Sequence, residues 1–165
     1  MGDSCAMAEL HLRPMTEAEF EAYLQRAISG YADQHVAAGS WLAEDAEKRA
    51  AAETAQLLPD GLETEDMLFF MAETEDGDAV GWVWLCLKSP RGERGFAWIY
   101  DIEVVADRRG EGYGRALLAA AEAELRLRDV PAVALNVFGP NVVAQRLYAT
   151  AGYELMSQQL RKELT

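Results

Sequence analysis

The sequence predicts one α+β domain built around a single central sheet. Its 165 residues fit the usual size of one compact domain. Short apolar runs typical of strands alternate with segments in which apolar residues recur every three or four positions, as on one face of a helix. In chain order the segments are strand, helix, helix, three strands, helix, strand, helix and a final pair of strands, which indicates an α+β fold.

One strand and two helices are expected in the first third of the chain. Residues 10–13 alternate between apolar and polar side chains, and the run ends at a proline. Thr16 and Glu19 have the spacing of a capping box, so a helix is expected to begin there and to end near Gly39. A second, alanine-rich helix is expected over residues 43–58.

Three strands are expected in close succession after these helices. They cover residues 67–72, 79–87 and 96–105, and turn-forming loops separate them. Because the connections are short, we expect these strands to pair antiparallel with their neighbours.

The last third of the chain is expected to add two helices and three strands. A helix begins near Gly112, a buried strand covers residues 133–138, and a further helix stops at Gly152. Two short strands, over residues 153–156 and 158–164, are expected to complete the sheet.

The charge balance and the cysteine content disfavour several classes of protein. Fifteen Lys and Arg against 28 Asp and Glu give a net charge of -13, which opposes binding to nucleic acid or to an anionic membrane surface. Basic or amine substrates are attracted more easily, although acidity also serves solubility. Two cysteines are too few for a disulfide framework or a zinc site, so we expect a cytoplasmic protein without a metal.

The first eight residues are expected to be an extension ahead of the domain, which then covers residues 9–165. The start lacks the basic and apolar regions of a signal peptide. In the whole sequence no apolar run approaches the ~20 residues of a membrane span.

A glycine-rich loop joins the last of the three clustered strands to the next helix. Gly110, Gly112 and Gly114 let consecutive backbone N–H groups face outward at a helix N-terminus, where the helix dipole also favours an anion. Arg115 stands where a Rossmann fingerprint needs its third glycine, and the Gly-Lys-Ser/Thr of a P-loop is missing from the loop. The loop by itself therefore predicts either a phosphate-bearing ligand or a plain turn.

Two spaced motifs resemble the GNAT acetyltransferase superfamily. The pattern Arg109-x-x-Gly112-x-Gly114 is similar to its pyrophosphate-binding motif. At matching distances, Leu135-Asn136-Val137 is followed by Asn141, Leu147-Tyr148 and Gly152-Tyr153. The resemblance covers about residues 10–164 and implies the GNAT fold, with a mixed sheet of about six to seven strands flanked by about four helices. Residues 31–45, 57–64 and 80–84 are similar to a little-characterised bacterial branch whose acceptor is unassigned.

The resemblance implies a binding site for acetyl-CoA. Backbone N–H groups of the glycine-rich loop would hold the pyrophosphate, and the strand before it would pair with the pantetheine arm. The Val104 N–H would donate to the thioester oxygen, where negative charge develops during attack. Asn141 would hydrogen-bond the pantetheine, cap its helix, or do both. The implied binding residues are Ile102, Val104, Arg109, Gly110, Gly112, Tyr113, Gly114, Arg115 and Asn141.

The resemblance also implies a general acid. Tyr148 matches the tyrosine that protonates the departing thiolate in many members of the superfamily. A phenol with an ordinary pKa of ~10 stays protonated at neutral pH and can donate. The alternative is a half-buried aromatic ring that only packs on the sheet.

The general base is less obvious from the sequence. Several members of the superfamily carry Glu or His where Trp98 or Tyr100 stands here, and others carry Glu where Asn136 stands. Strand alternation places Trp98 and Tyr100 on one face, together with Ile102 and Val104, and places Asp101 and Glu103 on the other face. A bulge in this strand would change which of its side chains face the substrate cleft. Glu103 is therefore expected as the base, with Asp101 as the alternative. For each, a structural carboxylate is an equally good interpretation.

The acceptor site is expected between the first two helices and the middle strands. Aromatic rings with nearby acids suit a cationic amine through cation–π contacts and charge pairing. Aromatic residues at these spacings also commonly form the core. The expected substrate-binding residues are Trp41, Trp82, Trp84, Tyr100 and Asn136.

The function that the resemblance implies is that of an acetyl-CoA-dependent N-acetyltransferase. The acceptor would be a primary amine of a small molecule or a protein, attacking directly in a ternary complex, and the enzyme would be a monomer or a homodimer. Two alternatives stay open. One is a domain that binds CoA as a sensor without turnover, and the other is an acyltransferase that uses a different acyl-CoA or a hydroxyl acceptor.

Overall fold

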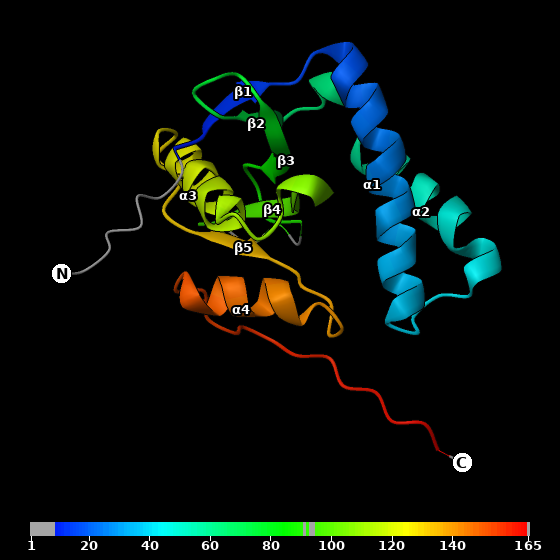
Figure 1. The fold of residues 1–165 in the computed structure, drawn as a ribbon. Coiled ribbons are helices and arrows are strands. Elements are labelled where there is room, and N and C mark those ends of the chain that lie inside the picture. Colours follow the sequence, from blue (N-terminus) through cyan, green and yellow to red (C-terminus); the bar gives the residue numbers. More distant parts are fainter. Residues whose placement is uncertain (1–8, 91, 93–94, 165) are drawn as a thin grey trace.

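The computed structural model of the protein describes residues 9–90, 92 and 95–164. Its central feature is a sheet in the order β1-β2-β3-β4-β5 (Figure 1). Neighbouring strands pair antiparallel, except that β4 and β5 are parallel. The strands are β1 (His11–Pro14), β2 (Met67–Glu73), β3 (Ala79–Cys86), β4 (Ala97–Val104) and β5 (Val133–Leu135). The extension expected over residues 1–8 lies outside the described residues.

Four α-helices flank the described sheet, as the sequence predicts. They are α1 (Glu17–Ala37), α2 (Ala43–Leu57), α3 (Tyr113–Arg126) and α4 (Val142–Thr150), with short 3-10 turns at Gly61–Glu63 and Ala106–Arg108. The predicted capping box is confirmed, because the Thr16 side chain accepts from the Glu19 N–H while the Glu19 carboxylate accepts from the Thr16 N–H. Within the described chain, no helix is long and apolar enough to cross a membrane.

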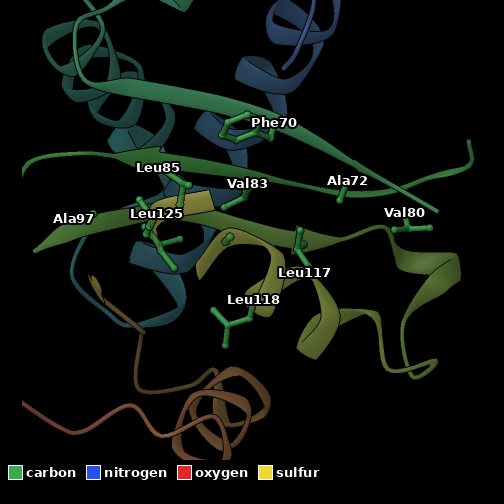
Figure 2. Close-up of a cluster of buried hydrophobic side chains, with 11 residues drawn as sticks. Phe70, Ala72, Val80, Val83, Leu85, Ala97, Leu117, Leu118 and Leu125 are labelled. Atoms are coloured by element: carbon green, nitrogen blue, oxygen red, sulfur yellow. The ribbon is translucent and has the colours of Figure 1, made fainter. Parts of the chain in front are cut away.

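The two faces of the sheet carry separate apolar cores. On one face, Leu117, Leu118 and Leu125 of α3 pack against strand side chains such as Val83 and Leu85 (Figure 2). On the other face, α1 packs through residues such as Phe20 and Tyr23 on the aromatic side chains of β2 and β3. The sheet is therefore buried on both sides, and ligands must enter at an edge or at a gap between strands.

A bulge in β4 changes the predicted distribution of its side chains. Trp84 lies opposite Asp101 whereas the next residue, Leu85, lies opposite Ile99, so Tyr100 is the extra residue. Ile102 consequently packs with the core under α3, while Tyr100 packs with the core under α1. The expectation that Tyr100 shares a face with Ile102 and Val104 was therefore wrong, because alternation is interrupted at the bulge.

Strand β5 is shorter than predicted. Residues 133–138 were expected to be extended in the sheet, but pairing with β4 ends at Leu135. Beyond it, the ring of Phe138 contacts His35 and Tyr31 of α1, with ring centroids 4.9 and 6.4 Å apart. Packing of this ring against α1 accompanies the departure of the chain from the sheet.

The two final strands expected over residues 153–156 and 158–164 do not form. The described residues after α4 contain no strand, and the sheet has five strands rather than six to seven. The apolar side chains of this segment, such as Leu155 and Leu160, are exposed. A pattern that permits strand formation does not supply a partner strand, and this segment pairs with neither edge of the described sheet.

Candidate active site

β4 extends past the end of β5, and we call the place beside this unpaired stretch of β4 the gap. β5 pairs with residues 97–99 of β4, whereas β4 continues to Val104. The Val105 N–H donates to the Val80 carbonyl of β3 at 2.9 Å, so by alternation the Val104 N–H points away from β3 and into the gap. An extended ligand could therefore pair with the main chain of β4 as an additional strand would.

The glycine-rich loop lies directly beyond this stretch of β4. Gly110 and Gly112 have φ values of 84° and 89°, and Gly112 is the N-cap of α3 without a capping side chain. Among the described residues, the backbone N–H groups of residues 110–114 have no hydrogen-bond acceptor, whereas those of Arg115 and Ala116 donate to the Gly112 carbonyl. Free N–H groups at a helix N-terminus form a site for an anion such as a phosphate.

A groove with two arginines adjoins the start of α3. Arg115 and Arg146 line it together with Val143, Leu147 and Thr150, around a volume of about 470 Å³. The Arg115 guanidinium donates to Thr150 Oγ1 at 2.7 Å, which holds the beginning of α3 to the end of α4. In a chain of net charge -13, these two arginines give the region a local positive charge.

The side chain of Arg109 folds back over the exposed edge of β4. Its Nε donates to the Val104 carbonyl at 3.0 Å, and its terminal nitrogen forms an ion pair with Glu103. A ligand that pairs with the Val104 carbonyl must therefore displace the Arg109 guanidinium.

Asp101 is the most firmly held acidic side chain near the gap. Its Oδ2 accepts from the Tyr23 hydroxyl at 3.1 Å and from the Trp82 indole Nε1 at 3.0 Å. Burial raises the pKa of Asp101, while the hydrogen bonds from Trp82, Tyr23 and the Ile102 N–H act in the opposite direction. The bulge at Tyr100 allows this contact because it turns Asp101 toward α1.

Glu103 lies two residues further along β4 and is more accessible. Its side chain is 43% exposed. Burial and the negative charge of Asp101 raise the pKa of Glu103, whereas Arg109 and Arg26 act in the opposite direction. The two carboxylates therefore differ in mobility, since Asp101 is fixed by donors and Glu103 is held by one flexible arginine.

Tyr148, the expected general acid, belongs to α4. Its ring packs against the core under α3 and lies 5.6 Å from the ring of Tyr153. Burial raises the pKa of Tyr148, and the charge of Asp101 raises it further. The phenol therefore stays protonated at neutral pH, as a general acid requires.

The expected acceptor aromatics fall into two groups. Trp82 is buried beside Asp101, with the Arg26 guanidinium 4.7 Å from its ring centroid. Trp84 is also buried, and it stacks on Tyr100 at 4.5 Å. Trp82 thus contacts Asp101 through its indole N–H, while Trp84 and Tyr100 pack in the same core under α1.

Trp41 belongs to a separate aromatic cluster at the far end of α1. It stacks on His35 with ring centroids 3.8 Å apart, and the Arg49 guanidinium lies 4.7 Å from its centroid. Burial lowers the pKa of His35, so the imidazole is neutral at pH 7. These contacts already occupy much of the Trp41 ring, and the structure does not bring Trp41 together with Trp82.

Asn136 and Asn141 lie on the β5 side of the gap. Asn136 is exposed just beyond the end of β5. Asn141 is the N-cap of α4, and its Oδ1 accepts from the Ala144 N–H at 3.1 Å. The capping role expected for Asn141 is therefore confirmed.

Two site residues, Tyr23 and Arg26, were missed in the sequence. Both belong to α1, and the sequence predicted a site role for neither of them. A buried tyrosine hydroxyl needs a partner, and that requirement was the available signal. The partner, Asp101, is 78 positions away in sequence. Among the described residues, no group of acidic, histidine or cysteine side chains could hold a metal ion.

Comparison with known proteins identifies the class to which this fold and site belong. Residues 35–153 match the model of the Acetyltransferase (GNAT) family, and the chain belongs to that family. It is 34% identical to the uncharacterised N-acetyltransferase YycN of Bacillus subtilis (strain 168) over 153 residues, which cover 93% of this chain and 97% of YycN. The crystal structure of YycN aligns with a TM-score of 0.90 at 32% identity, over 94% of this chain and 99% of that one.

Further relatives support an acyltransferase. A mycothiol acetyltransferase of Thermobispora bispora is 34% identical, over 81% of this chain and 42% of that protein. The structure of AAC(6')-Iy in complex with a bisubstrate CoA analogue shares the fold, with a TM-score of 0.59 at 16% identity over 95% of this chain and 99% of that one. The resemblance to the GNAT superfamily and the fold that it implies are confirmed. The protein is an acyltransferase that carries out acetyl transfer.

Proposed function

We propose that this enzyme transfers an acetyl group from acetyl-CoA to a primary amine of a small molecule or a protein, by direct attack in a ternary complex. The observation that carries the proposal is the free main chain of β4, which leads from two carboxylates to an anion-binding loop. AAC(6')-Iy binds the bisubstrate analogue CoA-S-monomethyl-acetylneamine, so a protein of this fold holds donor and acceptor together, as a ternary complex requires.

The donor would lie along β4 and end at the loop. The N–H groups of residues 110–114 would hold the pyrophosphate, with Arg115 and Arg146 near the phosphate-bearing end. Ile102 and Val104 would pair with the pantetheine through their main chain. The Val104 N–H would then donate to the thioester oxygen, and one such donor is worth ~3–4 kcal/mol in the transition state.

The acceptor would enter from the α1 side, beside Trp82. Asp101, fixed by Tyr23 and Trp82, would attract an ammonium group by its charge. Glu103 would accept the proton that the ammonium must lose, because its pKa is raised and its side chain is accessible. Displacement of Arg109 from Val104 by the donor would also loosen its ion pair with Glu103, and so would leave Glu103 free to act.

Attack by the amine requires one proton transfer at the nitrogen and another at the departing sulfur. Before attack, Glu103 passes the proton of the ammonium to bulk water and is ionised again. The neutral amine nitrogen then bonds to the thioester carbon, the carbon–sulfur bond breaks, and the nitrogen loses a second proton to Glu103, which returns it to water. Tyr148 donates its hydroxyl proton to the departing thiolate, and water returns a proton to the tyrosinate. The products are an amide and free CoA thiol.

A thiol-release assay tests the proposal directly. Acetyl-CoA should give free thiol with a panel of primary amines and much less with matched alcohols. Thiol release with alcohols alone would contradict the amine acceptor. Tight CoA binding with no thiol release from any acceptor would instead support a sensor domain.

Gly112→Val should lower the affinity for CoA by at least about tenfold. A valine is strained at φ 89°, and relief of that strain would move the N–H groups that face the anion. Isothermal titration calorimetry with CoA measures the effect. Gly61→Val is the matched control, because Gly61 has φ 57° in the 3-10 turn between α2 and β2 and should lose stability without losing CoA affinity. Unchanged affinity in Gly112→Val would contradict the assigned donor site.

The turnover rate should rise between about pH 6 and 8.5 and should not fall again below about pH 9. The rise follows deprotonation of the acceptor ammonium, whose pKa the site would lower toward neutrality. As the pH falls, Glu103 is protonated at a higher pH than an ordinary carboxyl group, because burial and the charge of Asp101 raise its pKa. The raised pKa of Tyr148 keeps the acid protonated through this range. A pH profile of kcat measures both the rise and the absence of a fall below about pH 9. Glu103→Gln is expected to lower kcat by ~10². A flat profile that is unchanged in Glu103→Gln would remove Glu103 from the mechanism.

A further inference from the structure

Arg26 of α1 lies over the ring of Trp82, on the side from which the acceptor would enter. Its guanidinium carbon is 4.7 Å from the centroid of that ring. At the edge of the same ring, the indole Nε1–H donates to Asp101 Oδ2 at 3.0 Å. Tyr23, one turn earlier in α1, donates to the same oxygen at 3.1 Å. A positive charge and a firmly held carboxyl group therefore flank one indole ring.

Arg26 has no acidic partner in the part of the chain that the structure describes. The residue is exposed, and its guanidinium makes no hydrogen bond or ion pair with another described residue. Arg109 differs in this respect, because it is paired with Glu103 and donates to the Val104 carbonyl. The planar guanidinium presents N–H donors in a fork that fits a carboxylate. Contact with the ring restricts the position of Arg26, while its donors stay free for a ligand.

The charges around the acceptor side balance one for one. Burial and the charge of Asp101 raise the pKa of Glu103, and the charges of Arg109 and Arg26 act against that rise. Two carboxyl groups are thus matched by two guanidinium groups, although the whole chain has a net charge of -13. A purely cationic acceptor would be repelled by Arg26, whereas an acceptor that carries its own negative group would be attracted by it.

We propose that the acceptor is a small zwitterionic amine, whose ammonium group binds at Asp101 and whose carboxylate binds at Arg26. The inference rests on the proposed transfer of an acetyl group to a primary amine, and it narrows the class of acceptor. The two binding groups lie over the face and at the edge of a single indole ring. A short carbon chain should therefore separate the nitrogen from the carboxylate, as in a short ω-amino acid. Arg26 binds the acceptor and takes no part in the proton transfers.

Matched pairs of acceptors test the proposal. Each pair consists of a short ω-amino acid and its amide, which differ in the carboxylate and keep the primary amine. Thiol release from acetyl-CoA should give a wild-type kcat/KM at least about tenfold higher for the amino acid. Arg26→Gln should abolish this preference by raising KM for the amino acid, with kcat nearly unchanged, because the carboxylate is remote from the reacting nitrogen. For the amide, the same variant should keep or raise kcat/KM, since a like charge is removed.

Arg49→Gln is the matched control. Arg49 of α2 is also exposed, and its guanidinium also lies 4.7 Å from the centroid of a tryptophan ring, that of Trp41 in the separate aromatic cluster. The control removes the same charge and the same kind of ring contact, and it should leave the preference for the amino acid unchanged. Calorimetry should give the wild-type affinity for CoA in both variants.

Equal losses for the amino acid and the amide in Arg26→Gln would overturn the proposal. An arginine that only covers Trp82 or only acts on the pKa of Glu103 affects every amine alike. A wild-type enzyme that acetylates the amides as well as the amino acids would also overturn it, and would leave the proposed function standing. No thiol release from any amine would instead contradict the proposed function, and this inference with it.

Discussion

Tyr148→Phe should lower kcat by ~10²–10³ and leave the affinity for CoA nearly unchanged. The substitution removes the hydroxyl that would protonate the thiolate and keeps the ring that packs against the core under α3. The raised pKa of Tyr148 makes this hydroxyl a donor, since the group is protonated across the working pH range. Steady-state thiol release gives kcat, and calorimetry gives the CoA affinity.

Tyr153→Phe provides the matched control for this experiment. Tyr153 is also partly buried, and its ring lies 5.6 Å from that of Tyr148. Loss of its hydroxyl should leave kcat within about twofold, because the acidic neighbour of Tyr153 is Glu122 of α3, whereas the charge of Asp101 in β4 acts on Tyr148. Full turnover in Tyr148→Phe would reduce Tyr148 to a packing residue. Equal losses in both variants would indicate a general disturbance of α4.

Gly81→Ala should destabilise the protein by about 2–4 kcal/mol. A Cβ at this position would lie 2.3 Å from the Glu103 carbonyl oxygen and 3.2 Å from the Leu117 side chain. Because the Glu103 carbonyl is main chain, β3 and β4 would have to move apart where they are paired. Thermal unfolding should show a fall in Tm, and CoA affinity should fall with it, since β4 carries the donor site.

Gly30→Ala is the opposite case and serves as the control. Gly30 lies in α1, and a Cβ there would meet nothing within 4 Å. Alanine in a helix interior is favoured over glycine by ~1 kcal/mol, so this variant should raise Tm. If Gly81→Ala were as stable as the wild type, the close approach of β3 and β4 would be contradicted.

Local sequence determined the four helices, strands β1 to β4 and the glycine-rich loop of this protein. The Thr16–Glu19 capping box marked the start of α1, and the apolar runs marked strands β2 to β4, because these signals involve residues close together in the chain. Gly110 and Gly112 of the glycine-rich loop have positive φ values, which residues with a side chain rarely adopt. These two positions could therefore be found from residue type alone. The same residues carried the resemblance to the family that the comparisons confirm.

Tertiary structure alone decided how the side chains meet. The bulge at Tyr100 arises from the pairing of β3 with β4, and it turned Asp101 toward Tyr23, far away in sequence. The ion pair of Glu103 with Arg109 depends on the path of the loop after β4. Residues 153–164 show the same limit, because an apolar pattern measures the capacity to pair, whereas a strand exists only where the fold brings a partner edge to it.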